Sequence, residues 1–378
     1  HTPPPPTPTT LFSSAASDVY KRQTISQDCI NQLAHTDTAN LAFVYLTDVL
    51  AKDLGDILRY LKEHTNIKHW VGSIAQGICC TDHEYYDQAA MVIMAGQFPE
   101  DSITVFHHAE DTQHLKSTST DDSFAGIRFA LVHGDPRNGQ IPELVEQLPG
   151  QLGNGYLVGG LTSSGTHMYQ VADSITEGQI SGIVFEDNVQ VLTGLTQGCS
   201  PIGPVHTLTD CDAHMAISID NKPALDIFKE DIGEVLARDI DRAAGYIFAG
   251  FPVKGSDTGD YLVRTNVGLN EDQGMLAIGE NMKPDCPIMF CRRDAQSAVE
   301  DMQRMLNNIK DRLGTQQPKG ALYISCLGRG HSLFGDDSQE LKMISDELGD
   351  IPLVGFYANG EIAGNQLYGY TGVLTLFV

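Results

Sequence analysis

The sequence predicts a mixed α/β fold of the α+β kind, in which repeated β-α-β-β units form mixed sheets flanked by helices. One observation is that a pattern of apolar strand, amphipathic helix and apolar strand recurs three times, at about residues 41–98, 127–196 and 320–378. The other is that hairpin patterns accompany these repeats, and hairpins combined with β-α-β units are typical of mixed sheets. With 378 residues, the chain is long enough for two domains or for one large one.

The first repeat starts with a continuous apolar strand, LAFVYLTDVL, at residues 41–50. Apolar residues at helical spacing then predict a helix over residues 52–64. The second strand, HWVGSIAQGICC at residues 69–80, ends in small side chains, and a third strand occupies residues 89–98. This order of strand, helix, strand and strand defines the repeat.

The second repeat has the same order. Strand IRFALVHGDP leads to a short helix over residues 141–148 and to strand GYLVGGLTSSG at residues 155–165. Residues 179–198 predict a hairpin with its turn at Asp187-Asn188. The phrases VGSIAQG, VGGLTSSG and VGFYANGE end the second strands of the three repeats, which favours true internal similarity over the ordinary recurrence of α/β elements.

The segment between the second and third repeats does not follow the repeat pattern. Residues 207–220 predict a hairpin, and a short helix follows over residues 223–232, with a proline in its first turn. Several strands lead to the longest amphipathic helix, over residues 295–313. The third repeat then consists of strand ALYISC, a helix over residues 338–348, and the strands IPLVGFYA and GVLTLFV.

Composition limits the partners that the chain can have. Of its 378 residues, 24 are Lys or Arg and 49 are Asp or Glu, a net charge of −25. Nucleic acids and anionic membranes attract basic surfaces, so we expect neither as a partner. No apolar run approaches the roughly 18 residues that span a bilayer. We expect a cytoplasmic protein.

The cysteines and glycines predict neither a metal site nor a cofactor. The eight cysteines are scattered, without the CxxC or paired His spacing of zinc sites. They are flanked by apolar residues and no signal peptide is apparent, which favours reduced thiols. Glycine-rich phosphate loops of the GxxxxGK[ST] or GxGxxG kind are absent from the sequence.

The first 23 residues are set aside from the fold. HTPPPPTPTT is proline-rich and of low complexity, and SSAASDVYKRQ reads like a translated sequencing adapter. We predict that residues 1–23 are a non-native or disordered leader. A natural disordered tail is the alternative, and it implies the same structural behaviour.

The third repeat contains thiol, guanidinium, amide and carboxylate side chains that lie close to glycines at strand ends. Cys326, Gly328 and Arg329 follow its first strand, and Asn359, Gly360 and Glu361 follow its second. Strand ends of α/β sheets line ligand crevices. A guanidinium between glycines can clamp a carboxylate or a phosphate. The alternatives for Arg329 are an internal salt bridge, with Glu361 as a candidate partner, and a position on the surface.

Cys326 is the candidate nucleophile. An ordinary thiol is only about 3% ionised at neutral pH, although a nearby arginine lowers its pKa. His331 is the nearest base in the sequence, but no orienting partner can be identified from spacing. Cys326 is therefore a catalytic nucleophile, a wall of a binding site, or a core residue.

Several motifs, in their order along the chain, resemble those of the FIST family: GCSPIG, YLVRTNVGLNEDQGMLAIGE, CRRDAQSAVEDM, SCLGRG and GFYANGEIAG. The resemblance implies two intimately associated domains, an N-terminal FIST domain at residues 24–222 and a C-terminal FIST domain at residues 223–378. It further implies a stand-alone sensory protein for a small-molecule ligand, with amino acids as candidate ligands and a signalling protein as a candidate partner. An enzyme acting on an amino-acid-like or carbonyl substrate through Cys326 and a protein-interaction scaffold are the alternatives.

We expect the ligand site where the GCSPIG, CLGRG and YANGE motifs converge. Its predicted residues are Gln197, Gly198, Cys199, Cys326, Gly328, Arg329, Asn359, Gly360 and Glu361.

Overall fold

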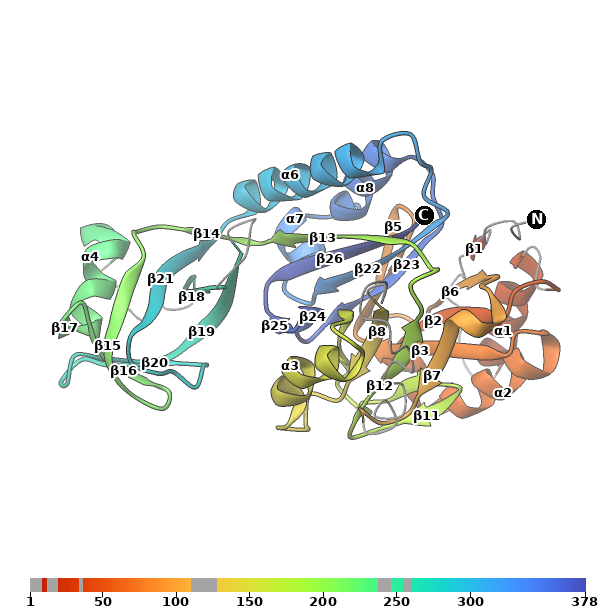
Figure 1. Cartoon of the computed structure of the whole chain (residues 1–378), viewed down its shortest axis with the longest axis horizontal. Helices are drawn as coiled ribbons and strands as arrows, with labels where there is room; N and C mark the ends of the chain where they lie inside the picture. Colours follow the sequence, from red (N-terminus) through yellow and green to blue (C-terminus); the bar gives the residue numbers. More distant parts are fainter. Residues whose placement is uncertain (1–8, 12–19, 34–36, 110–127, 237–245, 254–259) are drawn as a thin grey trace. The chain divides into compact units, whose positions relative to one another are not determined.

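The computed structural model describes residues 9–11, 20–33, 37–109, 128–236, 246–253 and 260–378 (Figure 1). The chain forms two compact units, which we call the repeat unit (residues 1–196 with 301–378) and the barrel unit (residues 197–300). Helices occur together with parallel and antiparallel strands, which confirms the predicted α+β fold class.

The repeat unit contains the three predicted repeats, each made of a first strand, a helix, a second strand and a last strand. Repeat 1 consists of β2 (Leu41–Thr47), α2 (Leu54–His64), β3 (His69–Ala75) and β6 (Met91–Gly96). Repeat 2 consists of β8 (Phe129–Gly134), α3 (Ile141–Gln151), β9 (Tyr156–Leu161) and β12 (Ile180–Phe185). Repeat 3 consists of β22 (Gly320–Cys326), α8 (Gln339–Leu348), β23 (Leu353–Ala358) and β26 (Thr371–Phe377).

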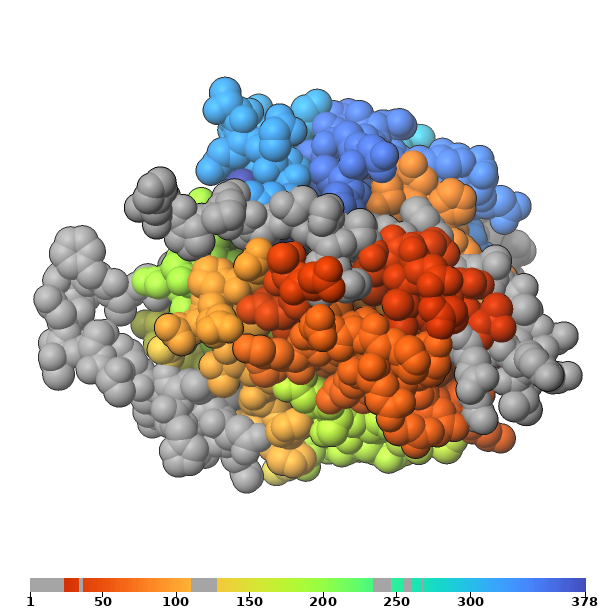
Figure 2. Space-filling view, turned by 90° about the vertical axis from the view of Figure 1, so that its right-hand side faces the viewer, coloured from red at the N-terminus to blue at the C-terminus, as the bar shows by residue number. Residues whose placement is uncertain are grey.

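The pairing of these strands is the same in all three repeats. The second strand lies parallel to the first, and the last strand lies antiparallel to the first on its other side. This shared topology confirms the internal repetition that the sequence predicts. Figure 2 shows repeat 1, in orange, between the blue segments of repeat 3 and the yellow-green segments of repeat 2.

The glycine of the shared VG phrase has one structural role in all three repeats. Gly72, Gly159 and Gly355 each lie beside the first strand of their repeat. A Cβ atom on them would lie 1.6 to 1.9 Å from a carbonyl oxygen of that strand, so no side chain fits. The phrase therefore reflects close approach of two strands.

A hairpin follows the second strand of each repeat and pairs with a neighbouring repeat. The hairpins are β4 (Gly77–Cys80) with β5 (His83–Tyr86), β10 (Gln170–Ala172) with β11 (Ser174–Thr176), and β24 (Glu361–Gly364) with β25 (Gln366–Tyr368). They pair with β23, β3 and β9 respectively, so each repeat extends the sheet of another in a cycle. The predicted single strand HWVGSIAQGICC is therefore two strands in two sheets.

The hairpin predicted over residues 179–198 is wrong. β12 has β8 on one side and β7 (Ile103–Phe106) on the other, so neither of its edges is free. The next strand, β13 (Val191–Gln197), instead joins β26 in another sheet. The Asp187-Asn188 turn thus connects two sheets.

The remaining elements of the repeat unit cover or extend its sheets. They are β1 (Thr9–Leu11), α1 (Tyr20–Gln32), η1 (Asp48–Asp53), η2 (Glu100–Ser102), α6 (Ala295–Leu313) and α7 (His331–Phe334). α6 occupies the residues predicted for the longest helix. β1 falls within the segment set aside as a leader and pairs with β6, while the other residues of 1–19 lie outside the described residues.

The two faces of the sheets have different cores. In repeat 1, Val44 and Leu46 pack with the apolar side of α2, as the alternation along a strand requires. On the opposite face, Phe43, Phe185 and Phe377 contribute one ring from each repeat, with centroids 5.7 to 6.5 Å apart. Aromatic packing at this spacing joins the three repeats into one core.

The barrel unit is a closed antiparallel sheet. Its six strands are, in order around the barrel, β15 (His206–Asp212), β16 (Met215–Ile219), β20 (Met275–Ile278), β19 (Tyr261–Asn270), β18 (Ile247–Pro252) and β21 (Cys286–Arg293). β21 then pairs with β15, which closes the ring. Short strands β14 (Cys199–Pro201) and β17 (Lys222–Pro223) and helix α4 (Ala224–Leu236) complete the unit.

Candidate functional site

The site is built on the turn that follows β22. The N–H of Arg329 donates to the carbonyl of Cys326 at 2.8 Å, which closes the turn directly after the strand. Gly330 ends it with φ at 51°, and a Cβ atom there would lie 2.3 Å from the hydroxyl of Tyr86. The glycine is therefore required by both backbone and space, and it places Arg329 inside the protein.

Arg329 is fully buried and forms an ion pair with Glu340, in the first turn of α8. The distance between Nε and Oε1 is 2.7 Å, and the guanidinium lies over the ring of Phe334. The salt bridge considered from the sequence, between Arg329 and Glu361, is therefore not the one that forms. Burial alone would lower the pKa of Arg329, but the charge of Glu340 raises it, so Arg329 stays charged.

Glu340 has a full set of donors. The hydroxyls of Tyr323 and Ser325 and the N–H of Gly330 donate to its carboxylate at 2.6, 3.1 and 3.0 Å, in addition to Arg329. Sequence reasoning missed this residue, because its position in an amphipathic helix start looks like an ordinary exposed acidic position. Glu340 positions Arg329 and has no hydrogen-bonding capacity left over for a ligand.

Three buried atoms near this pair have no hydrogen-bond partner: Nη1 and Nη2 of Arg329 and Oε1 of Glu361. Glu361 is also fully buried, and its other oxygen accepts hydrogen bonds from the N–H and the hydroxyl of Thr371, at 3.1 and 2.8 Å. Burial raises the pKa of Glu361 to about 7, although Thr371 and the positive charge of Arg329 oppose the shift. Unpaired buried polar groups are rare in folded proteins, so these three atoms need a partner.

Cys326 lies beside Glu361 and is partly exposed. Burial of the sulfur and the negative charge of Glu361 raise the pKa of the thiol well above its ordinary value, although the N–H groups of Gly328 and Tyr370 lower it. A raised pKa favours the protonated thiol at neutral pH, whereas an activated nucleophile needs a lowered one.

The structure brings together four of the predicted residues, Cys326, Gly328, Arg329 and Glu361. Asn359 and Gly360 lie at the end of β23, where their backbone pairs with Leu161 of repeat 2 at 2.8 to 2.9 Å. The side chain of Asn359 is exposed. These two residues therefore join repeats 2 and 3, and a role in ligand binding stays a prediction for them.

Gln197, Gly198 and Cys199 belong to the barrel unit, whereas the other predicted residues belong to the repeat unit. The side chain of Gln197 donates to the carbonyl of Tyr261 at 2.9 Å, and the hydroxyl of Tyr261 donates to the carbonyl of Cys199. These bonds fix the start of β14 against β19. The ligand-binding role predicted for the three residues stays a prediction.

A second polar group next to Gly330 comes from repeat 1 through the β4–β5 hairpin. The hydroxyls of Tyr357 and Tyr86 both donate to Glu84, and the N–H of Glu84 donates to Ser338 at 3.1 Å. Burial raises the pKa of Glu84. The sequence gives no signal for this contact, because the hairpin lies more than 240 residues before Gly330.

Two further properties of the structure bear on function. Among the residues that the structure describes, no group of three or more His, Cys, Asp or Glu side chains could hold a metal ion. Within the same residues, every helix is too short or too polar to cross a membrane.

Comparison with known proteins identifies the family. The FIST N domain family matches residues 40–222, and the FIST C domain family matches residues 224–364. An uncharacterized protein of Mycobacterium tuberculosis is 28% identical over 348 residues, which cover 85% of this chain and 87% of that protein. An uncharacterized protein of Mycobacterium bovis is 28% identical over 346 residues, which cover 85% of this chain and 86% of that protein.

Proposed function

Because the chain belongs to the FIST family, whose domains are sensory domains of signal transduction, we propose that it is a sensor that binds an amino acid or a closely related metabolite. The proposed site consists of Arg329, Glu361 and Cys326. The observation that carries the proposal is the set of three unpaired buried atoms on Arg329 and Glu361.

The chemistry of these atoms defines the ligand. Glu340 occupies Nε of Arg329, which leaves both Nη groups to bind a carboxylate through two hydrogen bonds. The free oxygen of Glu361 can accept a hydrogen bond from an ammonium group. Each buried polar group that lacks a partner costs about 1–3 kcal/mol, so a ligand that supplies both partners recovers this cost.

Access to the site requires a small movement, because Arg329 and Glu361 are fully buried. Leu327, Gly328 and Tyr370 are partly exposed around them. A Cβ atom on Gly328 would lie 3.3 Å from the ring of Tyr370, so the two residues are in close contact. Displacement of the Tyr370 ring would open the site beside Cys326.

Covalent catalysis fits the same geometry less well. The pKa of the Cys326 thiol is raised, whereas a nucleophilic cysteine needs a lowered one. We therefore favour binding over an enzyme that acts through Cys326. A protein-interaction scaffold would bind no metabolite at this site, so the binding experiment separates it from a sensor.

The test is a thermal-shift screen of the twenty standard amino acids, followed by titration calorimetry of those that raise the melting temperature. We expect Arg329→Ala to weaken binding by about 2–5 kcal/mol, or about 30- to several-thousand-fold. Glu361→Gln keeps the shape of the side chain and serves as a second variant if Arg329→Ala does not fold. Arg137→Ala, in the corresponding turn of repeat 2, is the matched control.

The pH dependence of binding provides an independent check. Only ionised Glu361 pairs with an ammonium group, and at pH 6 a group with a pKa of about 7 is about one-tenth ionised. Affinity should therefore be about tenfold lower at pH 6 than at pH 8 in the native protein, and should not change with pH in Glu361→Gln. Unchanged affinity in a folded Arg329→Ala variant, or no ligand in the screen, would disprove the proposal.

A further inference from the structure

A cavity of about 450 Å³ lies at the other end of the repeat unit from Arg329. Its walls include Phe129 and Tyr156, at the starts of β8 and β9, and Val191 and Thr193 of β13. Val378, which directly follows β26, also lines it, and β26 runs antiparallel to β22. The cavity is therefore near the amino end of β22, whereas Arg329 follows the carboxyl end.

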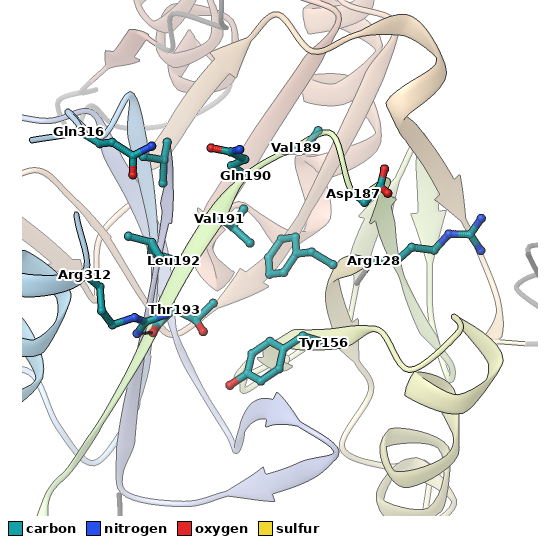
Figure 3. A pocket seen from close by; sticks show the side chains of 12 residues that line it. Arg128, Tyr156, Asp187, Val189, Gln190, Val191, Leu192, Thr193, Arg312 and Gln316 are labelled. Carbon is teal, nitrogen blue, oxygen red and sulfur yellow. Dashed lines mark hydrogen bonds between the residues drawn. The ribbon is translucent and has the colours of Figure 1, made fainter. Parts of the chain in front are cut away.

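The two arginines of the cavity differ in their charge partners. Figure 3 shows them on opposite sides of the cavity, with Arg312 next to Thr193. Arg128 forms an ion pair with Glu186, at 2.8 Å. Arg312 donates to the carbonyl of Thr193 at 2.7 Å, and across the described ranges no carboxylate lies within ion-pairing distance of it.

A guanidinium with no carboxylate partner among the described residues is unusual in a chain with a net charge of −25. Arg312 is exposed, and its hydrogen bond to the Thr193 carbonyl directs the side chain toward the cavity. A guanidinium directed at a cavity is suited to a carboxylate, because its planar donors match the two oxygens.

The middle of the cavity wall is apolar and partly aromatic, whereas Asp187, Gln190 and Gln316 add polar groups to the lining. Phe129 is buried, Val191 and Leu192 are half-buried, and Tyr156 is 37% exposed. In Figure 3 the ring of Tyr156 points from β9 toward the side of Thr193 and Arg312. Flat rings pack well against aromatic side chains, and small-molecule sites combine such walls with a few polar groups in a volume of about 300–1,000 Å³.

We propose that this cavity binds a small aromatic carboxylate, with its ring between Tyr156, Phe129 and Val191 and its carboxylate on Arg312. This site shares no residue with the Arg329–Glu361 site and does not depend on the function proposed for it. A peptide strand is a poorer fit, because the carbonyls of Thr193 and Leu195 on the edge strand β13 are already bound by Arg312 and Arg304.

The arginine pair on α6 offers a matched control. Arg304 binds the carbonyl of Leu195 as Arg312 binds that of Thr193, but Arg304 is paired with Asp301 and does not line the cavity. Removing either arginine costs β13 one hydrogen bond. Only the loss of Arg312 should affect the ligand.

The experiment is titration calorimetry of the full chain with 2-naphthoate and with 2-naphthamide, which has the same ring system and no charge. We expect the native protein to bind 2-naphthoate at least about tenfold more tightly than 2-naphthamide. Arg312→Ala should remove this preference and Arg304→Ala should keep it. Tyr156→Ala should weaken both probes.

Two results would contradict the proposal. Failure of the native protein to bind 2-naphthoate would disprove it, as would an equal preference in Arg312→Ala. Binding of 2-naphthamide to Arg312→Ala shows that this variant is folded, and Arg312→Lys, which retains the charge, should keep part of the preference. Amino-acid binding at the Arg329 site should be unchanged in all four variants, so the two proposals can fail separately.

Discussion

Repeats 2 and 3 use the same backbone arrangement to hold different side chains. In the first strand of each repeat, one residue lies opposite the VG glycine: Val132 in repeat 2 and Tyr323 in repeat 3. The residue three positions later is Asp135 in repeat 2 and Cys326 in repeat 3. In repeat 2, Asp135 accepts hydrogen bonds from the N–H groups of Arg137 and Gly178, at 2.9 and 2.8 Å. In repeat 3, the corresponding N–H groups of Gly328 and Tyr370 face the sulfur of Cys326.

The comparison separates the residues that hold the backbone in place from those with groups left over to bind a ligand. In both repeats this residue anchors the start of the last strand, and Gly178 and Tyr370 share a positive φ, of 76° and 61°. In repeat 2 the anchor residue also has a charge partner, because Arg137 forms an ion pair with Asp135. Repeat 3 instead has a neutral thiol at the anchor, and its arginine has two donors left over. The spare hydrogen-bonding capacity, rather than the cysteine, is the reason why we propose a ligand site in repeat 3.

We expect the largest effect from breaking the buried ion pair between Arg329 and Glu340. Repeat 2 has no such pair at the start of its helix α3 among the described residues. Glu340→Ala leaves Arg329 with no partner in a buried position and should lower the free energy of unfolding by about 3–5 kcal/mol. Urea unfolding followed by circular dichroism measures this loss. Glu143→Ala, in the first turn of α3, changes an exposed residue and should cost less than about 0.5 kcal/mol. Equal losses in the two variants would contradict the assignment.

A smaller effect is expected at the anchor of repeat 2. Asp135→Ala leaves the N–H groups of Arg137 and Gly178 without an acceptor and should cost about 1–3 kcal/mol at pH 7. Burial alone would raise the pKa of Asp135, but the hydrogen bonds from Arg137 and Gly178 lower it below its ordinary value. A lowered pKa stabilises the folded state above about pH 4, and this stabilisation is lost as the pH falls further. Urea unfolding at pH 7 and pH 3 should therefore show a smaller cost at pH 3.

The smallest effect is expected at the anchor of repeat 3. Cys326→Ala should cost about 1 kcal/mol or less, because a thiol accepts only weak hydrogen bonds. The raised pKa keeps the thiol neutral in the folded state, and the unfolded thiol is neutral below about pH 8. In a Glu361→Gln background, which removes the titration of the neighbouring carboxyl, the cost should therefore be equal at pH 3 and pH 7. A cost that falls at low pH, as for Asp135→Ala, would show that the sulfur carries a charge.

Part of the site could be predicted from the sequence because its residues are close along the chain. Cys326, Gly328 and Arg329 lie in one turn, and glycines beside a charged residue at a strand end indicate a ligand crevice. The partner of Arg329 could not be chosen in this way, because Glu340 and Glu361 both follow within one repeat. The choice depends on how α8 packs against β22, which places Glu340 next to Tyr323 and Ser325.

The sequence by itself determined the three repeats, the α+β class and the bounds of α6. These features depend on short-range rules: the alternation of apolar residues, the helical stripe, and the absence of a Cβ atom at Gly72, Gly159 and Gly355. Only the tertiary structure decided the exchange of hairpins between repeats, because each hairpin pairs with whichever sheet edge is free. It also decided the three unpaired atoms on Arg329 and Glu361, since burial and pairing depend on side chains brought together from distant parts of the chain.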